Sequence, residues 1–269
     1  MDLGLTGRGV LIVGATGGIG KATCEQLASE GARVVAAARD ADALRELTAR
    51  LGSASAGSVT IDLSDSASIV RAVEAARTQL EGRIDGLVCA AAGARFRSIW
   101  ELTREEWFEE LGVKYVGAGE LCREVARHMV DQGDGVIVAL TGIAASKVVS
   151  ANPMNGGANA ALENLLRVLA AQTAISGVRV VGVSPGFTAS RRFDAFAADQ
   201  LAEVRASIPI GRIAAPEEIA SVIAFLLSPR ASYLTGSIVT ADGGASIWDQ
   251  RLSESAQQLS RWKEHEDDR

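Results

Sequence analysis

The feature that most constrains this chain is an apolar segment that runs into closely spaced glycines. Residues 10–13 are Val-Leu-Ile-Val, and Gly14, Gly18 and Gly20 follow within seven residues, before a helical pattern begins. A strand, a tight glycine turn and a helix N-terminus together form a site for phosphate groups. In such a turn, Gly14 permits the sharp bend, Gly18 lets the backbone approach a pyrophosphate, and Gly20 lets the helix pack closely on the strand. The stretch therefore predicts a unit that binds a dinucleotide.

Apolar strand patterns and helical patterns alternate along the rest of the chain. This alternation predicts one α/β domain over residues 1–246, a Rossmann-type, doubly wound parallel sheet with helices on both faces, and a polar extension over 247–269. Residues 187–209 have no strong period and predict a lid over the site. The expected strands are 10–13, 33–38, 59–61, 84–91, 135–141, 178–184 and 237–240, and the expected helices include 41–51, 103–132, 153–176 and one that Pro216 opens.

Composition and charge narrow the classes of partner. The chain has 269 residues, a net charge of −6 and no basic stripe, which argues against nucleic acid or an anionic membrane as a partner. No apolar run is long enough to span a membrane and no secretory signal precedes the domain, so a cytoplasmic location is expected. Cys24, Cys89 and Cys122 are isolated in apolar patterns, which predicts reduced thiols in the core. With two histidines in the chain, no metal site is expected.

Several motifs in the correct order resemble the short-chain dehydrogenase/reductase family over residues 5–246. Residues 13–20 resemble the family's TGxxxGIG turn with Val13 in place of its threonine, and Asp62 stands where the family has an adenine-contacting aspartate. Residues 89–93, Cys-Ala-Ala-Ala-Gly, resemble the NNAG strand end, with alanines in place of both asparagines. The Pro-Gly pair at 185–186 with Thr188, and the Leu-Thr-Gly and Asp-Gly-Gly stretches within 234–244, resemble the later signatures.

The resemblance implies a nicotinamide dinucleotide as cofactor. An acidic residue after the second strand would bind the ribose of NAD, and a basic residue would bind the 2′-phosphate of NADP. Ala38 fills the place of the acid and Arg39 follows it, so NADP is the expected cofactor and NAD the alternative; an ordinary surface role is the other interpretation of Arg39. The expected cofactor-binding residues are Gly14, Thr16, Gly18, Ile19, Gly20, Arg39, Asp62, Leu63, Ala90, Ala91, Gly93, Pro185, Gly186 and Thr188.

The resemblance also implies a hydride transfer between the nicotinamide and a small alcohol or carbonyl substrate. The family uses a serine, a tyrosine and a lysine, with an asparagine behind them; in register, these positions hold Gly142, Asn155, Asn159 and Lys114 here. An amide cannot exchange a proton near neutral pH, so ordinary ketone reduction is expected to be weak or absent.

Three functional hypotheses follow. The first is an enzyme with a rebuilt catalytic set of Lys114, Asn155, Asn159 and Thr141, in which a desolvated lysine could support elimination or isomerisation as well as redox chemistry. The second is a catalytically inactive subunit that supports an active relative. The third is a sensor of NADP.

Each candidate residue also has an ordinary structural interpretation. Lys114 can extend to the surface or pair with Glu110. Lys147 is expected to be a surface residue, and Asn155 and Asn159 can be tolerated polar residues at the edge of a cavity. The expected assembly is a homodimer, a homotetramer or a hetero-oligomer with another member of the family.

Overall fold

The computed structural model describes residues 2–90, 98–148, 153–190, 193 and 196–247. Their centre is a parallel sheet of seven strands in the order β3-β2-β1-β4-β5-β6-β7. The fold class predicted from the sequence is thus confirmed. The strands are β1 Gly9–Val13, β2 Arg33–Ala38, β3 Ser55–Thr60, β4 Gly86–Cys89, β5 Gly135–Leu140, β6 Val178–Pro185 and β7 Ile238–Ala241.

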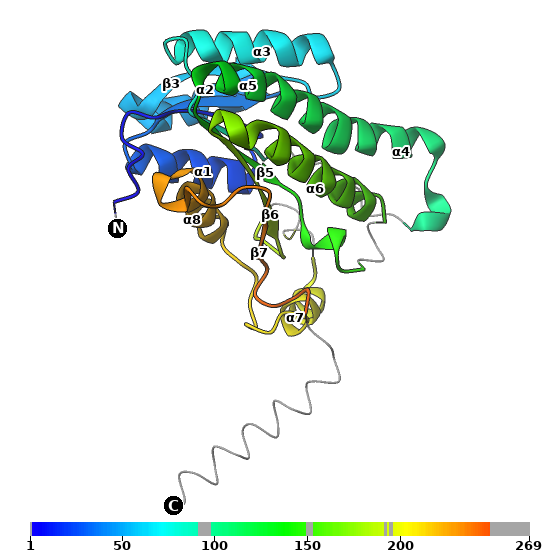
Figure 1. Cartoon of the computed structure of the whole chain (residues 1–269). Coiled ribbons are helices and arrows are strands. Elements are labelled where there is room, and N and C mark those ends of the chain that lie inside the picture. The colour runs from blue at the N-terminus through cyan, green and yellow to red at the C-terminus, as the bar shows by residue number, and fades with distance from the viewer. Residues whose placement is uncertain (1, 91–97, 149–152, 191–192, 194–195, 248–269) are drawn as a thin grey trace, which may run out of the picture.

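Helices cover both faces of the sheet. Figure 1 shows α3, α5 and α6 on one side and α1 and α8 on the other. The helices are α1 Gly18–Ser29, α2 Ala41–Leu51, α3 Ser66–Gln79, α4 Arg104–Leu111, α5 Ala118–Gln132, α6 Pro153–Thr173, α7 Ala198–Ala206 and α8 Pro216–Leu227. Short helical segments include the π-helical η3 Gly112–Gly117 and the 3₁₀ segments η4 Ile143–Ala145 and η7 Pro229–Ala231.

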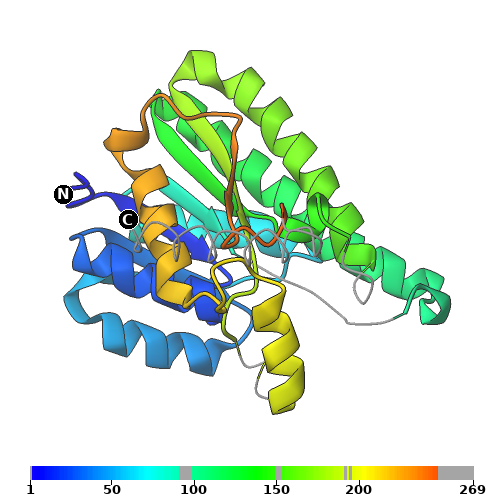
Figure 2. The same cartoon turned by 90° about the horizontal axis from the view of Figure 1, so that it is seen from below.

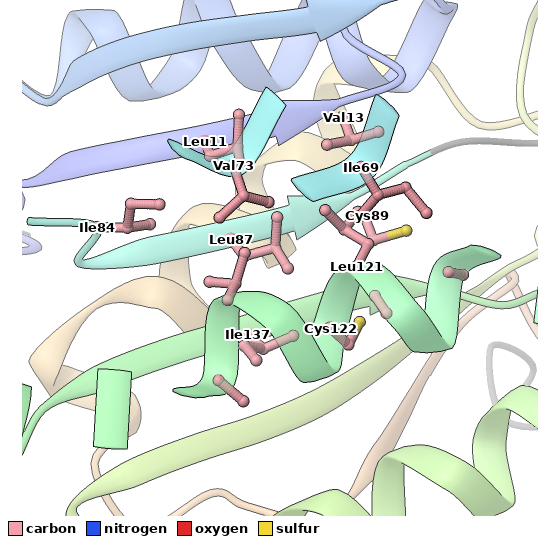
Figure 3. Packing of buried hydrophobic residues seen from close by; sticks show 14 of the residues in the cluster. Leu11, Val13, Ile69, Val73, Ile84, Leu87, Cys89, Leu121, Cys122 and Ile137 are labelled. Atoms are coloured by element: carbon pink, nitrogen blue, oxygen red, sulfur yellow. The ribbon is translucent and has the colours of Figure 1, made fainter. Parts of the chain in front are cut away.

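Alternation along the strands produces two separate cores. In β1, Leu11 and Val13 join the apolar cluster under α3, α5 and α6, whereas Val10 and Ile12 join the cluster under α1, α2 and α8. This is the period of two that a strand buried on both faces requires. Figure 3 shows the first cluster, where Cys89 and Cys122 lie among aliphatic side chains.

The chain order of the strands creates a topological switch point between β1 and β4. β1 pairs with both β2 and β4, so the chain winds outward in opposite directions from β1 and β4. In open α/β sheets, ligands bind beyond the carboxyl ends of the strands at such a switch point. The residues that follow β1 through β6 are therefore placed along the carboxyl edge of the sheet.

The predicted helix over 103–132 differs from the structure in two ways. It is divided into α4 and α5 by the π-helical turn η3, and Trp107, expected on the inward stripe, is 36% exposed. Figure 1 shows α4 projecting beyond the sheet, and α4 packs mainly on α6 and η3. Trp107 is exposed because α4 lies beyond the end of the described strands.

The predicted irregular segment 187–209 contains a helix. α7 spans Ala198–Ala206 and buries none of its residues. A helix without a buried face leaves no apolar period in the sequence, so the pattern could not reveal it. Figure 2 shows α7 outside the main helical layers. Within the described residues, no helix has the length and apolarity needed to cross a membrane.

Candidate functional site

The glycine turn between β1 and α1 forms an open cradle. Gly14 has a φ of +85°, which favours glycine, and a Cβ on Gly20 would lie 2.1 Å from the Gly14 carbonyl oxygen. Thr16 is exposed, and α1 begins at Gly18. The turn therefore directs backbone N–H groups and a helix N-terminus toward the carboxyl edge of the sheet, the arrangement that binds phosphate.

The chain beyond β6 returns to this turn. A Cβ on Gly18 would lie 3.4 Å from the Ala189 carbonyl oxygen and 3.7 Å from Cγ of Pro216. Thr188 forms a parallel bridge with Ala214, and its hydroxyl donates to the Gly186 carbonyl at 3.2 Å. These contacts place Ala189, the residue after Thr188, beside the glycine turn, while Pro185 and Gly186 lie at the end of β6.

Polar residues follow β2 and β3 at the same edge. The Oδ1 atom of Asp62 accepts from the backbone N–H and the hydroxyl of Ser64, at 2.9 and 2.7 Å. These bonds, together with the nearby charge of Arg39, hold the pKa of the Asp62 carboxyl below its ordinary value. Arg39 itself is exposed, so both side chains can be reached from solvent.

The rest of the loop after β3 and the end of β4 are more enclosed. Leu63 is buried, and a Cβ on Gly117 would lie only 2.0 Å from its carbonyl oxygen, so the helical turn at Gly117 packs directly on this loop. After β4, the Ala90 N–H donates to the Val13 carbonyl at 2.8 Å. Ala91 and Gly93, two of the expected cofactor residues, lie outside the described residues.

Lys114 is a buried cation in the π-helical turn. Its side chain is 4% exposed, and its Nζ donates to the carbonyl of Leu140, the last residue of β5, at 2.9 Å. Single π-helical turns occur frequently at functional sites. The turn brings this ammonium to the carboxyl edge of the sheet, where the glycine turn also lies.

Asn159 is a fully buried amide on the facing helix α6. No described residue forms a hydrogen bond with its Oδ1 or Nδ2. Gly142 has a φ of 163°, an extended conformation that any residue adopts, but a Cβ there would lie 3.1 Å from Asn159 Nδ2. Asn159 therefore fills the space beside Gly142 without a hydrogen-bond partner in the described part of the chain.

Asn155 lies one helical turn before Asn159 and is partly buried. Its neighbour Gly156 packs on the loop after β5, because a Cβ there would lie 2.8 Å from the Ala144 carbonyl oxygen. The structure thus brings Asn155, Asn159 and Gly142 to one place, with Lys114 held at the adjacent end of β5.

Thr141 has its hydroxyl engaged on the α6 side. Thr141 Oγ1 lies 3.1 Å from Glu163 Oε1 and 3.3 Å from the Val183 carbonyl oxygen, and a hydroxyl donates its one hydrogen to one of them. Glu163 was not among the residues expected at the site. It stands four residues after Asn159, so the spacing of one helical turn could have indicated it.

The two tyrosines lie elsewhere. Tyr115 is partly buried and packs against the core under α5 and α6, and Tyr233 is wholly exposed before the amino end of β7, at the opposite edge of the sheet. Among the described residues, no group of three or more His, Cys, Asp or Glu side chains could hold a metal ion.

The geometry agrees with comparisons to known proteins. A family model described as enoyl-(acyl carrier protein) reductase matches residues 14–246. The chain belongs to the short-chain dehydrogenase/reductase family. Members of this family bind nicotinamide dinucleotides and are typically oligomeric.

The relatives within the short-chain dehydrogenase/reductase family are similar along nearly their whole length. The chain is 32% identical over 252 residues to the D-threitol dehydrogenase of Mycolicibacterium smegmatis, an alignment that covers 91% of this chain and 95% of the relative. It is 30% identical over 238 residues to the 3-oxoacyl-(acyl-carrier-protein) reductase of Escherichia coli, covering 88% and 97%. A solved short-chain type dehydrogenase/reductase from Mycobacterium marinum superposes with a TM-score of 0.85 at 29% identity, covering 91% and 97%.

Proposed function

We propose that this protein is an NADP(H)-binding oxidoreductase for a small hydroxyl or carbonyl substrate, with an atypical catalytic set centred on Lys114. The observation that carries the proposal is the meeting, at one edge of the sheet, of a glycine cradle, a buried ammonium and a buried amide with no hydrogen-bond partner among the described residues. Ordinary ketone reduction is expected to be slow, because Gly142, Asn155 and Asn159 stand at the family's serine, tyrosine and lysine positions.

The residues present fit a dinucleotide. The cradle at Gly14–Gly20 would hold the pyrophosphate, because Thr16 and Gly18 are exposed at the N-terminus of α1 and leave the backbone N–H groups open to a ligand. Asp62 uses Oδ1 for Ser64, so Oδ2 is left to accept a bond from an adenine amino group. Exposed Arg39 would pair with a 2′-phosphate, which supports NADP over NAD.

Asn159 would complete the nicotinamide half of the site. Its amide offers one acceptor and two donor hydrogens, and a ribose hydroxyl pair both donates and accepts. Binding there would satisfy a group whose burial without partners is otherwise costly. The bound nicotinamide would supply hydride transfer.

Lys114 would provide the positive charge of the site. A buried ammonium attracts negative charge that develops on a substrate oxygen, and its low-dielectric surroundings strengthen that attraction. The hydrogen bond to Leu140 fixes the position of the ammonium. Asn155 would orient the substrate, and Thr141 with Glu163 would position α6 against the end of β5.

Turnover of the Lys114→Met variant tests the catalytic part of this proposal. With NADP⁺ or NADPH and a panel of polyols, hydroxy acids and ketones, we expect measurable turnover by the wild type and a loss of about 10²-fold or more in the variant. Surface variant Arg71→Gln is the control, since Arg71 lies on the exposed face of α3. Unchanged turnover in Lys114→Met would remove Lys114 from the mechanism.

A catalytically inactive subunit is the second candidate, and one surface favours it. Trp100, Trp107, Phe108 and Val116 are 92%, 36%, 60% and 51% exposed on and around α4, which provides an apolar face for a partner subunit. Light scattering of the protein alone and mixed with an active family member would test this. Mixed oligomers with higher activity than the active member alone would support the subunit, whereas a homo-oligomer with its own turnover would exclude it.

A further inference from the structure

Lys147 lies in the loop that leaves the candidate site, and its environment is unusual for a lysine. The side chain was expected at the surface, but it is partly buried, and its Nζ donates to the carbonyl of buried Ala245 at 2.5 Å. This single bond joins the loop after β5 to the segment after β7. The ammonium carries three donor hydrogens, so two remain for other acceptors.

The loop that carries Lys147 contacts the residues of the candidate site at two points. It begins at Gly142 against Asn159, and the Ala144 carbonyl contacts Gly156, the residue after Asn155. Ile143, Ile208 and Ala245 form a small apolar cluster against which Phe187, Val204 and Ile213 pack. The ammonium therefore stands beside an apolar wall that links the site to the segment containing α7.

The charge of Lys147 has no counter-ion within the described part of the chain. No described carboxylate lies within salt-bridge distance, and its one hydrogen-bond partner is a neutral carbonyl. A partly buried ammonium without an opposite charge is costly to retain unless a ligand supplies that charge. By contrast, Arg8 at the opposite edge of the sheet is paired with both Asp85 and Asp134.

We propose that Lys147 binds a carboxylate of the substrate, so that this site takes small hydroxy or oxo acids rather than neutral alcohols or ketones. A single ammonium matches the single charge of a carboxylate, and such charge-assisted hydrogen bonds are stronger than neutral ones. The proposal rests on the proposed function for the location of the reacting group, and it adds the chemical class of the substrate.

The test compares matched acids and ketones. NADPH affinity is measured first by fluorescence for the wild type and the Lys147→Gln variant, and equal values are expected because the hydrogen bond of Lys147 goes to Ala245 and not to the glycine turn. Calorimetry with the NADP⁺-loaded protein then compares 4-oxopentanoate and 5-oxohexanoate with 2-pentanone and 2-hexanone. At least one acid should bind about tenfold or more tightly than its ketone, and Lys147→Gln should remove that advantage while Lys147→Arg retains it.

Controls separate this inference from the function on which it rests. Arg71→Gln should leave the advantage of the acid unchanged, and added salt should reduce it. Equal binding of acid and ketone, or an advantage that survives in Lys147→Gln, would overturn the inference while nucleotide binding stood. If NADPH does not bind, the proposed function fails, and the same titration on the protein without nucleotide still decides whether Lys147 binds carboxylates. Thermal unfolding of each variant shows whether it remains folded.

Discussion

At the scale of single residues, Asn159 combines a cost to stability with a suggested role. Its amide is completely buried and neither polar atom has a partner among the described residues. A buried polar group left unpaired costs about 1–3 kcal/mol of folding free energy. Such a cost is commonly tolerated where a ligand later supplies the missing partner.

Replacing Asn159 with leucine should therefore have opposite effects on stability and on binding. We expect the Asn159→Leu variant to gain about 1 kcal/mol in free energy of unfolding without ligand, because an apolar side chain with the same branching at Cγ replaces unpaired polar atoms. We expect its affinity for NADPH to fall by about tenfold. Denaturant unfolding and a fluorescence titration measure the two quantities. A loss of stability in the variant would mean that the amide has a partner within the folded chain.

The three cysteines provide a second residue-scale prediction. Cys24, Cys89 and Cys122 are buried and form no disulfide within the described residues; burial raises the pKa of Cys24 to about 12, and contact with Cys89 together with burial raises the pKa of Cys122. A thiol whose pKa is raised stays protonated at pH 8 and is a poor nucleophile. We expect a thiol reagent such as Ellman's reagent to modify none of them rapidly in the native protein and all three in guanidinium. Rapid native labelling of any one would contradict their burial.

Sequence reasoning at this scale succeeded where a motif fixes the backbone and failed where tertiary contacts decide. The roles of Gly14 and Gly20 in the turn follow from the glycine spacing, and the structure supplies the close contact that requires Gly20. The proximity of Gly142 to Asn159 and the contact between Thr141 and Glu163 depend on how α6 packs across the end of β5. The bond from Lys114 to the Leu140 carbonyl depends on how the π-helical turn packs against β5. Nothing in a local pattern determines those distances.

At the scale of elements, the divided helix α4–η3–α5 is the least ordinary part of the fold. The π-helical turn spans Gly112–Gly117, and its two glycines have very different surroundings. A Cβ on Gly117 would lie 2.0 Å from the Leu63 carbonyl oxygen, whereas a Cβ on Gly112 would meet nothing within 4 Å. The close approach at Gly117 is what allows the turn to lie against the loop after β3.

These two glycines form a matched pair of variants. Gly117→Ala should destabilise the protein by about 2 kcal/mol or more, because the helix must move away from the backbone of Leu63. Gly112→Ala should be neutral or stabilising by up to about 1 kcal/mol, because alanine favours the helix and has space there. Denaturant unfolding of both variants tests the packing. Equal effects of the two substitutions would show that the helix does not approach Leu63 as described.

Elements with a buried face were predictable and the others were not. The helix at residues 41–51 was predicted with the bounds it has, because Leu44, Leu47 and Leu51 mark its buried stripe. α7 has only partly buried side chains such as Val204 and left no such mark, and the π-helical turn lies within an otherwise regular helical pattern. Periodicity reports burial, so it reveals a helix only through the face that the helix buries.

At the scale of the whole molecule, the parallel sheet explains why residues distant in sequence form one site. The residues after β1, β3, β5 and β6 share an edge because all seven strands run in the same direction. The glycine cradle at this edge is complete in its backbone, while the proposed substrate half contains Lys114 and two asparagines. Nucleotide binding is thus the property that the glycine cradle predicts whether or not the substrate half is active.

A fluorescence titration of the wild-type protein with NADPH and with NADH tests this central claim most directly. The cradle, Asp62 and exposed Arg39 together predict saturable NADPH binding at micromolar concentration and binding of NADH about tenfold weaker or more. Tighter binding of NADH would contradict the role proposed for Arg39. Absence of binding by both nucleotides at millimolar concentration would contradict the account as a whole.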